Sequence, residues 1–261
     1  MTRMLRVLLC LVAVVCLMGG FAQAKDIEKV RIGTEGAYPP FNYVDSNGDL
    51  QGFDIDIAKA LCDAMDVECE FVMQEWSGMI PGLLAKKYDA IIASMSITEE
   101  REKKVDFTEK YYQTPAKFVA RKGTIEDINK DTLQGKVVGV QRATIHENFV
   151  RDKFGDLVEV RSYETLEEAN MDLISGRLDL ICADSVPLQE SLLDKDFGKD
   201  FHFVGPGYVD EKWFGEGIGI AVRKEDDKLR KMFNKAIQKI RENGTYQKIN
   251  AKYFDFDVYG D

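Results

Sequence analysis

The sequence predicts an α/β protein with two lobes around a shared crevice, and three observations lead to this prediction. Short apolar strands alternate with amphipathic helices, which is typical of α/β folds. The pattern then restarts, because residues 136–141 echo residues 30–35 and residues 173–181 echo residues 84–92. In both copies polar residues follow the strand, at the end where open α/β sheets bind ligands. A chain of 261 residues is long enough for two modest domains.

The first 24 residues are predicted to be a secretory signal peptide. Arg3 and Arg6 precede the apolar run 7–18, and residues 22–24 have the small-x-small pattern of a cleavage site. The apolar run is too short for a comfortable transmembrane span. We therefore expect cleavage before Lys25 and export of the mature protein.

Charge and composition argue against several classes of partner. The formal net charge of −10 becomes −12 once Arg3 and Arg6 leave with the signal peptide. Nucleic acids and anionic lipids attract basic surfaces, so neither is expected as a partner. The mature chain keeps three cysteines and two histidines, which lack the spacing of metal ligands, so we expect no metal and no other cofactor.

The three cysteines of the mature chain are expected to play structural roles. Cys62 and Cys69 can close a small loop at the end of a predicted helix, and an exported protein meets oxidising conditions, so we expect a disulfide there. Cys182 lies in an apolar strand and is expected to be a buried free thiol.

Periodicity and turn residues give the expected elements in order. Asn47-Gly48 predicts a hairpin turn, and Leu50 stands where a calcium-binding EF-hand loop needs glycine. The expected strands are 30–34, 70–73, 90–93, 117–120, 136–141, 178–182 and a returning strand within 215–222. The expected helices are 54–65, 78–87, one starting at Ser96, one starting near Thr144, 229–240 and 245–253.

Residues 93–101 are predicted to form a clamp for an anion. Ser96 and Glu99 have the spacing of a capping box, and the N–H groups at a helix start suit a carboxylate. Arg101 adds a planar fork that can bind a carboxylate through two hydrogen bonds. The alternative is a solvated helix start whose arginine pairs with a glutamate.

The remaining candidate residues fit recognition of an α-amino acid. Asp184 can bind an ammonium group, so with Arg101 it can pair both charges of a zwitterion. Tyr38 and Trp76 can sandwich a side chain, and Glu35 at the far wall can pair with a second cation. The sequence contains no nucleophile elbow, P-loop or zinc-protease motif, so we do not expect an enzyme.

Five motifs carry a family resemblance: GTEGAY (33–38), GFDIDIA (52–58), SITEER (96–101), DFT (106–108) and YFDFDVYG (253–260). Through them the whole mature chain resembles the periplasmic solute-binding proteins of polar amino-acid ABC importers, in the lysine/arginine/ornithine- and histidine-binding branch. The resemblance implies a periplasmic location, the type II periplasmic-binding-protein fold, and an inner-membrane ABC permease as partner. We expect a monomer, and the sequence does not exclude a chemoreceptor as a further partner.

The resemblance also implies how the chain divides between the lobes. In this fold the chain crosses between the lobes twice, and the lobes close by hinge motion at the crossovers. We expect these hinges near residues 113–118 and 209–214. The implied division is a signal peptide over 1–24, a first lobe from 25–115 and 213–261, and a second lobe from 116–212.

By motif match, the resemblance assigns roles to the polar residues. Arg101 and Thr144 would hold the α-carboxylate of the ligand. Asp184 would hold its α-amino group, together with Ser94 and Ser96. The Cys62–Cys69 pair also matches a disulfide of that branch. The implied ligand-binding residues are Glu35, Tyr38, Trp76, Ala93, Ser94, Met95, Ser96, Arg101, Gln141, Thr144, His146 and Asp184.

The residues expected around the side chain of the ligand differ from those that are usual in that branch. Glu35 stands where Asp is common, and Trp76 where Phe or Leu is. Ala93, Ile145 and His146 stand where serine, threonine and glutamine are usual, which removes polar contacts. We expect a cationic L-amino acid as ligand: arginine, ornithine, lysine or histidine. The alternatives are an opine such as octopine or nopaline, or an enzyme similar to cyclohexadienyl dehydratase.

Overall fold

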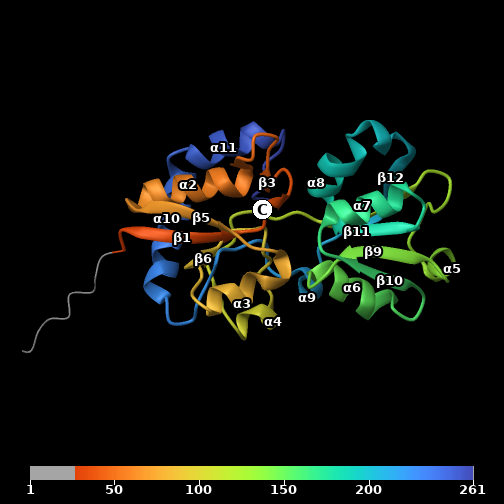
Figure 1. The fold of residues 1–261 in the computed structure, drawn as a ribbon, viewed down its shortest axis with the longest axis horizontal. Helices are drawn as coiled ribbons and strands as arrows, with labels where there is room; N and C mark the ends of the chain where they lie inside the picture. The colour runs from red at the N-terminus through yellow and green to blue at the C-terminus, as the bar shows by residue number, and fades with distance from the viewer. Residues whose placement is uncertain (1–26, 261) are drawn as a thin grey trace, which may run out of the picture.

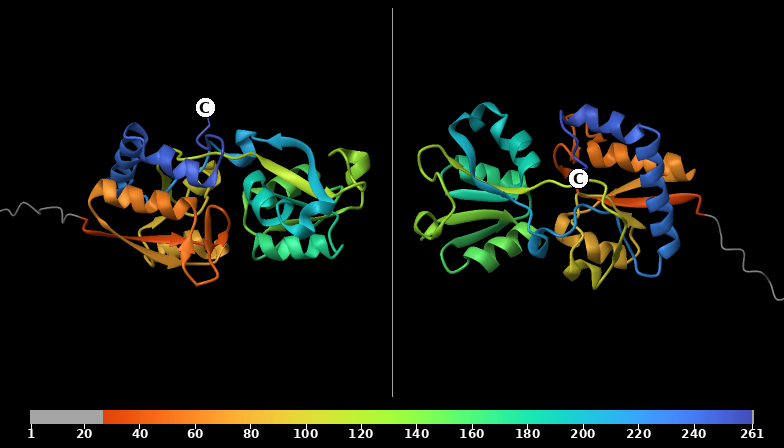
Figure 2. Two further views of the ribbon diagram at one scale, coloured as in Figure 1. Left: turned by 90° about the horizontal axis from the view of Figure 1, so that it is seen from above. Right: turned by 180° about the vertical axis from the view of Figure 1, so that it is seen from behind.

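The structure is a computed structural model that describes residues 27–260 and shows two lobes side by side (Figure 1). Each lobe contains a five-stranded sheet, and two segments of chain run between the lobes (Figure 2). The predicted two-lobe α/β architecture is therefore confirmed. The predicted signal peptide, residues 1–24, lies outside the described residues.

The first lobe is built on a mixed sheet. Three neighbouring strands run parallel, and the returning strand pairs antiparallel with its two neighbours. In spatial order the strands are β5 (Glu68–Met73), β1 (Lys29–Thr34), β6 (Ala90–Ile91), β13 (Ala221–Val222) and β7 (Asp106–Phe107).

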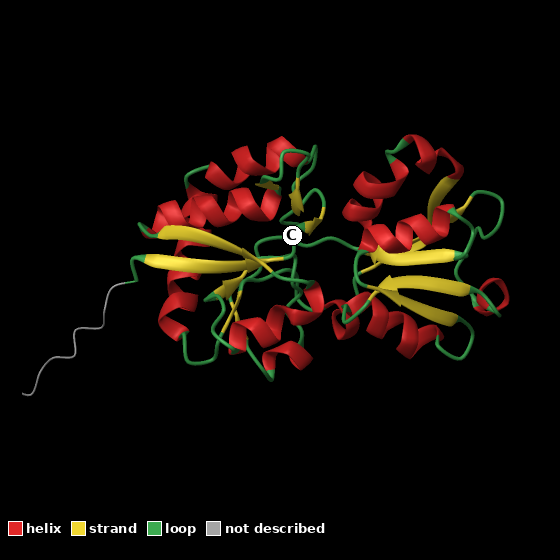
Figure 3. Cartoon of the chain, in the orientation of Figure 1, coloured by secondary structure: helices red, strands yellow, loops and turns green. Residues whose placement is uncertain are grey.

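Helices cover both faces of this sheet (Figure 3). On one face α2 (Phe53–Met65), α10 (Asp227–Glu242) and α11 (Thr245–Tyr253) contact one another. On the other face lie α3 (Met79–Leu84) and α4 (Glu99–Glu102). The predicted helix over 54–65 is thus confirmed to within one residue.

The amphipathic pattern explains why the last two helices pack where they do. The apolar side chains of α10 recur every three or four residues and are buried, which stabilises the lobe by about 1.5–3 kcal/mol for each fully buried large side chain. Gly244 adopts φ +79° and turns the chain between α10 and α11. The buried residues of α10 are Leu229, Phe233, Ala236, Ile237 and Ile240.

In the first lobe the predicted hairpin is present, whereas one predicted helix is shorter than expected. The hairpin around Asn47-Gly48 is confirmed, because β3 (Asn42–Val44) pairs antiparallel with β4 (Leu50–Gln51). The helix predicted over 78–87 is shorter than expected. It ends because Lys86 adopts a left-handed backbone conformation with φ +61°, which no helix can continue through.

The second lobe repeats the plan of the first. Its central strands are also parallel, and an antiparallel pair completes the sheet. In spatial order the strands are β10 (Glu159–Tyr163), β9 (Val137–Gln141), β11 (Leu180–Asp184), β8 (Ala116–Arg121) and β12 (Phe201–Tyr208). The helices are α5 (Lys130–Leu133), α6 (Ile145–Phe154), α7 (Leu166–Ile174) and α8 (Ser185–Leu188), followed by the π-helical turn η2 (Gln189–Leu193).

The internal echo in the sequence corresponds to a structural repeat. β1 lies between β5 and β6 as β9 lies between β10 and β11, and all these pairs are parallel. Because the carboxyl ends of β1 and β9 point toward the other lobe (Figure 1), the polar residues that follow them meet between the lobes.

The chain passes to the second lobe between β7 and β8 and returns between β12 and β13. The return includes the short helix α9 (Glu211–Phe214), which contacts α6. Trp213 and Phe214 pack in the apolar cluster of the second lobe. We therefore propose that the second lobe extends to Phe214, instead of ending at residue 212 as expected from the sequence.

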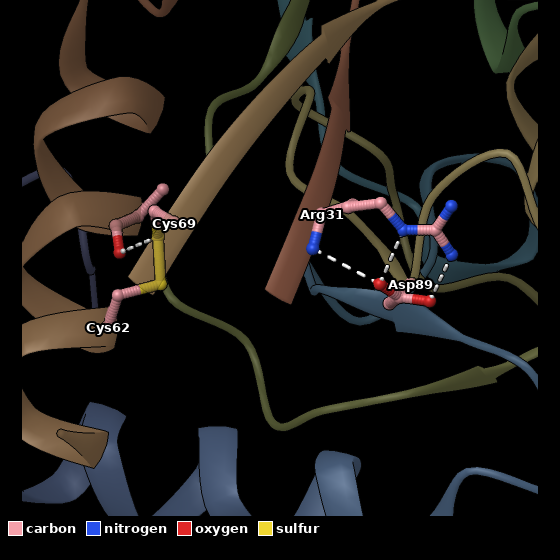
Figure 4. The surroundings of a disulfide bond; sticks show 5 residues. Arg31, Cys62, Cys69 and Asp89 are labelled. Carbon is pink, nitrogen blue, oxygen red and sulfur yellow. Dashed lines mark hydrogen bonds and ion pairs between the residues drawn. A yellow bond between two sulfur atoms is a disulfide. The ribbon is translucent and has the colours of Figure 1, made fainter. Parts of the chain in front are cut away.

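The predicted disulfide is present. Cys62 at the end of α2 is bonded to Cys69 at the start of β5, with their Cα atoms 6.0 Å apart (Figure 4). Cys182 is a buried free thiol, as predicted, and burial raises its pKa well above the usual value. Beside the disulfide, Asp89 accepts hydrogen bonds from the backbone and side chain of Arg31, which ties β1 to the start of β6.

Candidate ligand-binding site

The carboxyl ends of the strands of both lobes line a pocket between the lobes. The pocket is lined by Glu35, Tyr38, Trp76, Ala93, Ser94, Ser96, Arg101, Gln141, Thr144, Ile145, His146 and Asp184.

The pocket brings together all but one of the residues expected from the sequence. The exception is Met95, which is 1% exposed and packs in the apolar cluster with Met79 and Leu83. Ser94 and Ser96 line the pocket, whereas the side chain of Met95 between them packs in the apolar core. Ile145 takes part in the lining although it was not among the expected residues.

Arg101 reaches the pocket from a helix that begins later than predicted. The N-cap of α4 is Thr98 and not the predicted Ser96. The side chain of Thr98 accepts a hydrogen bond from the backbone N–H of Arg101. The prediction was wrong because Ser96 stays extended and pairs with Ile218 of the returning segment. Because α4 has only four residues, its helix dipole is weak. The main positive charge at this part of the pocket is therefore the guanidinium of Arg101.

The guanidinium of Arg101 is half-buried and makes no ion pair with a carboxylate of the described residues. Its Nη1 donates to the backbone oxygen of Ser96 at 2.9 Å, and its Cζ lies 5.3 Å from the ring centroid of Trp76. Within residues 27–260 no carboxylate oxygen lies within 4.0 Å of it, so the alternative of an arginine paired with a glutamate is wrong. Burial lowers the pKa of Arg101 to about 10. A partly buried cation of this kind is costly unless an anion joins it.

Asp184 faces the pocket from the end of β11. Its carboxylate accepts hydrogen bonds from the Tyr38 hydroxyl at 2.8 Å and from the Thr114 hydroxyl at 3.2 Å. Nε2 of His146 lies 3.6 Å from Asp184 and has no hydrogen-bond partner in the described chain. Burial, together with the charge of Asp184, raises the pKa of Tyr38 well above its usual value, so Tyr38 remains a hydrogen-bond donor.

The hydroxyl of Ser94 is oriented by a buried carboxylate behind the pocket. Asp54, in the first turn of α2, accepts hydrogen bonds from Ser94 at 3.0 Å, Tyr111 at 2.7 Å and Asn42 at 2.9 Å. Ser94 has φ +56°, a left-handed conformation that this network holds in place. Because its proton points to Asp54, the oxygen of Ser94 can accept a hydrogen bond from a ligand but not donate one.

Glu35 occupies the other end of the pocket. Its Oε1 accepts a hydrogen bond from Nε2 of Gln141 at 2.5 Å, and Gln141 also donates to the backbone oxygen of Glu164 at 2.9 Å. Burial raises the pKa of Glu35 to about 7, and the hydrogen bond from Gln141 opposes part of that shift. A cation next to Glu35 would restore its ionised form.

Thr144 caps α6, as the sequence predicts. Its hydroxyl accepts from the backbone N–H of Glu147 at 3.2 Å and donates to the backbone oxygen of Gln141 at 2.7 Å. The first N–H groups of a helix lack intrahelical partners, so the start of α6 presents donors to the pocket beside Thr144.

Hydrogen bonds made by pocket-lining residues join the two lobes. Tyr38 donates to Asp184, Gln141 donates to Glu35, and Nε1 of Trp76 donates to the backbone oxygen of Ala143 at 3.0 Å. The lobes are therefore closed on the pocket in this structure.

Within residues 27–260 no group of three or more His, Cys, Asp or Glu side chains is arranged to hold a metal ion. Over the same residues no helix is both long and apolar enough to cross a membrane.

Fold and pocket together define a two-lobe binding protein that closes over a small ligand. The family model of the bacterial extracellular solute-binding proteins, family 3, matches residues 30–256, and the chain belongs to this family.

Similar proteins agree with this assignment. An L-arginine-binding protein of Pseudomonas aeruginosa is 51% identical over 232 residues, which cover 88% of this chain and 90% of the relative. A histidine-binding periplasmic protein of Escherichia coli is 43% identical over 234 residues, which cover 89% of this chain and 90% of the relative.

Solved structures show the same fold. A Salmonella typhimurium periplasmic binding protein described as highly specific for arginine has a TM-score of 0.81 and 33% identity, over 87% of this chain and 99% of that chain. An ancestral amino-acid-binding protein described as a precursor of cyclohexadienyl dehydratase has a TM-score of 0.77 and 32% identity, over 87% of this chain and 96% of that chain.

Proposed function

We propose that this chain is the periplasmic binding component of an ABC importer and that it binds a cationic L-amino acid, arginine first, between its lobes. One observation carries the proposal: the pocket holds the guanidinium of Arg101, which makes no ion pair with a carboxylate of the described residues, and two carboxylates, Asp184 and Glu35. A ligand with one carboxylate and two cationic groups complements all three. The relatives described as arginine- and histidine-binding proteins support the same class of ligand.

The α-carboxylate of the ligand would bind at Arg101, and the start of α6 would add backbone donors. The hydroxyl proton of Thr144 is already directed to Gln141, so Thr144 would act through its backbone N–H. The α-ammonium group would bind Asp184 and the oxygen of Ser94, which is oriented as an acceptor. Ser96 would add a further contact nearby.

The ligand side chain would extend from these clamps toward Glu35. Tyr38 and Trp76 would contact its aliphatic part, and the ionised carboxylate of Glu35 would pair with its cationic end. Ala93 and Ile145 offer only apolar contacts there.

A second candidate function is that of a dehydratase. It is favoured by the raised pKa of Glu35, which suits a general acid near neutral pH, and by the ancestral precursor among the structural neighbours. We place it second because the relatives with the highest identity are described as binding proteins. Turnover of prephenate or arogenate by the purified protein would establish it.

We further propose that the partner in the membrane is an ABC permease and that the chain acts as a monomer. The first crossover lies between β7 and β8, and the second lies between β12 and β13. Both would act as hinges when the lobes close. A chemoreceptor that recognises the closed form is compatible with this role.

The test is a thermal-shift screen of the mature protein after unfolding and refolding to remove bound ligand. The panel would contain arginine, ornithine, lysine, histidine, glutamine, octopine and nopaline. A ligand at about a hundred times its dissociation constant should add roughly 2.7 kcal/mol of stability. Stabilisation by cationic amino acids is expected. Stabilisation by opines alone, or by none of the panel, would contradict the proposal.

A further inference from the structure

One of the hydrogen bonds between the lobes joins two uncharged groups, the indole N–H of Trp76 and the backbone oxygen of Ala143. Trp76 opens the short 3-10 turn η1 (Trp76–Gly78) after β5 in the first lobe, and its Nε1 donates to the backbone oxygen of Ala143 at 3.0 Å. Ala143 lies in the loop between β9 and α6 of the second lobe. This contact can exist only while the lobes are closed.

The acceptor of that bond is held in an unusual conformation. Ala143 has φ +56°, which is uncommon for a residue with a side chain and needs support from its surroundings. The support comes from Glu147, whose Oε2 accepts a hydrogen bond from the backbone N–H of Ala143 at 2.7 Å. Glu147 therefore fixes the peptide that Trp76 reaches.

Glu147 is itself held firmly in the second lobe. Its Oε1 accepts hydrogen bonds from Ser162 at 2.6 Å and from Arg151, whose Nη2 is 2.8 Å away. Burial alone would raise the pKa of Glu147, but these hydrogen bonds and that from Ala143 lower it below the usual value. The carboxylate thus stays ionised and keeps its place at neutral pH.

Trp76 is anchored on the other side by the residue proposed to bind the ligand carboxylate. The guanidinium carbon of Arg101 lies 5.3 Å from the ring centroid of Trp76, within the range of a cation–π contact. The ring therefore lies between the carboxylate end of the pocket and the loop of the second lobe.

We propose that Glu147 is a positioning residue for ligand retention: it holds Ala143 where Trp76 can bond to it, and this latch keeps the lobes closed over the ligand. We call Trp76, Ala143 and Glu147 the latch. The proposal rests on the proposed function, because it assigns the latch a role in the release of the bound amino acid. It predicts that the latch governs the dissociation rate and leaves the association rate nearly unchanged, because the bond forms only after closure.

The first test is Trp76→Phe, which keeps an aromatic ring over Arg101 and removes the indole N–H. Stopped-flow measurement with L-arginine should show dissociation faster by roughly 2- to 10-fold, the effect of one net hydrogen bond. An unchanged dissociation rate in Trp76→Phe would overturn the latch.

The second test asks whether Glu147 acts on the dissociation rate through the hydrogen bond between Trp76 and Ala143. Glu147→Ala should speed dissociation to a similar extent, whereas Glu147→Gln, which keeps an oxygen for Ala143, should restore part of the effect. In the Trp76→Phe background, Glu147→Ala should add nothing further, because the donor to Ala143 is already absent. Additive effects would show that Glu147 acts only on local stability.

A helix cap elsewhere in the same lobe controls for such local effects. Asn129→Ala removes the cap of α5, which lies at the outer end of the second lobe (Figure 1), and should leave the dissociation rate unchanged. An equal acceleration in Asn129→Ala would also overturn the latch.

Failure of the proposed function can be distinguished from failure of the latch. If the refolded wild-type protein binds none of the amino-acid panel, the proposed function fails. The latch is then measured without ligand, from the distance between spin labels placed at the exposed positions Lys59 and Lys130 on α2 and α5. A closed population that decreases in Trp76→Phe supports the latch, and identical distance distributions refute it.

Discussion

The two ends of the pocket are built differently. At the end proposed to bind the amino and carboxylate groups, polar side chains are fixed by groups outside the pocket: Asp184 by Thr114, and Ser94 by Asp54. At the other end Glu35 has a single side-chain partner, Gln141, and burial raises its pKa to about 7. In this closed structure the polar groups of the first end already have protein partners, whereas the charge state of Glu35 depends on the ligand.

This difference separates affinity from selectivity. A clamp whose groups are already held in the closed form binds the part that all amino acids share and needs little further rearrangement to do so. The end of the pocket proposed to bind the ligand's side chain selects among amino acids, because only a cationic side chain keeps Glu35 ionised. Substitutions at the end that binds the amino and carboxylate groups should therefore weaken binding of every amino acid, whereas substitutions at the other end should change which amino acid is preferred.

Arg101→Ala should have the largest effect on binding. Without it the ligand carboxylate would be buried unpaired, and we expect a loss of about 3–5 kcal/mol of binding free energy for every amino acid that the protein binds. Isothermal titration calorimetry measures this loss. The free energy of unfolding should change by no more than about 1 kcal/mol, because a hydrogen bond and a costly, partly buried charge are removed together. Arginine binding within a few-fold of the wild type would contradict the assignment of the clamp.

Glu35→Gln should affect ligands selectively. Arginine should lose roughly 1.5–3 kcal/mol of binding free energy, the usual range for a hydrogen bond to a charged group, while glutamine should bind as well as before or better. Competition binding measures the ratio of the two affinities. Glu68→Gln, an exposed carboxylate on β5, serves as the control. An equal loss for both ligands would mean that the two ends of the pocket are not separate in function.

The pH dependence of arginine affinity should also come from the side-chain end. Glu35 has a pKa of about 7 in the empty pocket and must be ionised to pair with a cation, so binding releases a proton below pH 7. Between pH 8 and pH 6 the affinity should fall roughly tenfold, and Glu35→Gln should abolish most of this change. A flat profile in the wild-type protein would contradict the assignment.

Stability of the empty protein should depend on pH in the same window with a definite sign. Glu35 has a higher pKa when folded than when unfolded, so between about pH 4.5 and pH 7 the unfolded state binds fewer protons. The contribution of Glu35 to the free energy of unfolding should therefore decrease as pH rises through this window. Asp54, whose pKa burial raises to about 6, acts in the same direction. Comparison of the denaturation curves of wild type and Glu35→Gln isolates the part due to Glu35.

Much of this site could be predicted because strand ends are visible in the sequence. Glu35 follows the strand 30–34 and Asp184 follows the apolar run 178–183, so periodicity places both at the ends of parallel strands. Tyr38 instead lies in β2 (Ala37–Tyr38), which pairs antiparallel with β3. Residues that act through distant contacts could not be found in this way. Asp54 and Ser94 are bonded although 40 positions separate them, and no local pattern marks Thr114 as a partner of Asp184.

The start of α4 shows a second limit of the sequence. Ser96 and Thr98 both fit the pattern of an N-cap, and local sequence does not decide between them. The decision comes from the returning segment, where Ile97 N–H donates to Gly217 at 2.8 Å and Ser96 pairs with Ile218. These residues lie more than a hundred positions further along the chain. Tertiary pairing of this kind overrides a local preference.

Met95 provides the smallest and most specific test of the comparison. The sequence places it among the ligand-binding residues, but the structure packs its side chain with Met79 and Leu83, away from the pocket. Met95→Leu conserves volume and should lower the free energy of unfolding by less than about 1.5 kcal/mol. Affinity for arginine should stay within twofold, measured by calorimetry on the same samples. A selective loss of affinity would mean that the wall behind Ser94 and Ser96 moves with the core, and that the clamp is less rigid than its hydrogen bonds indicate.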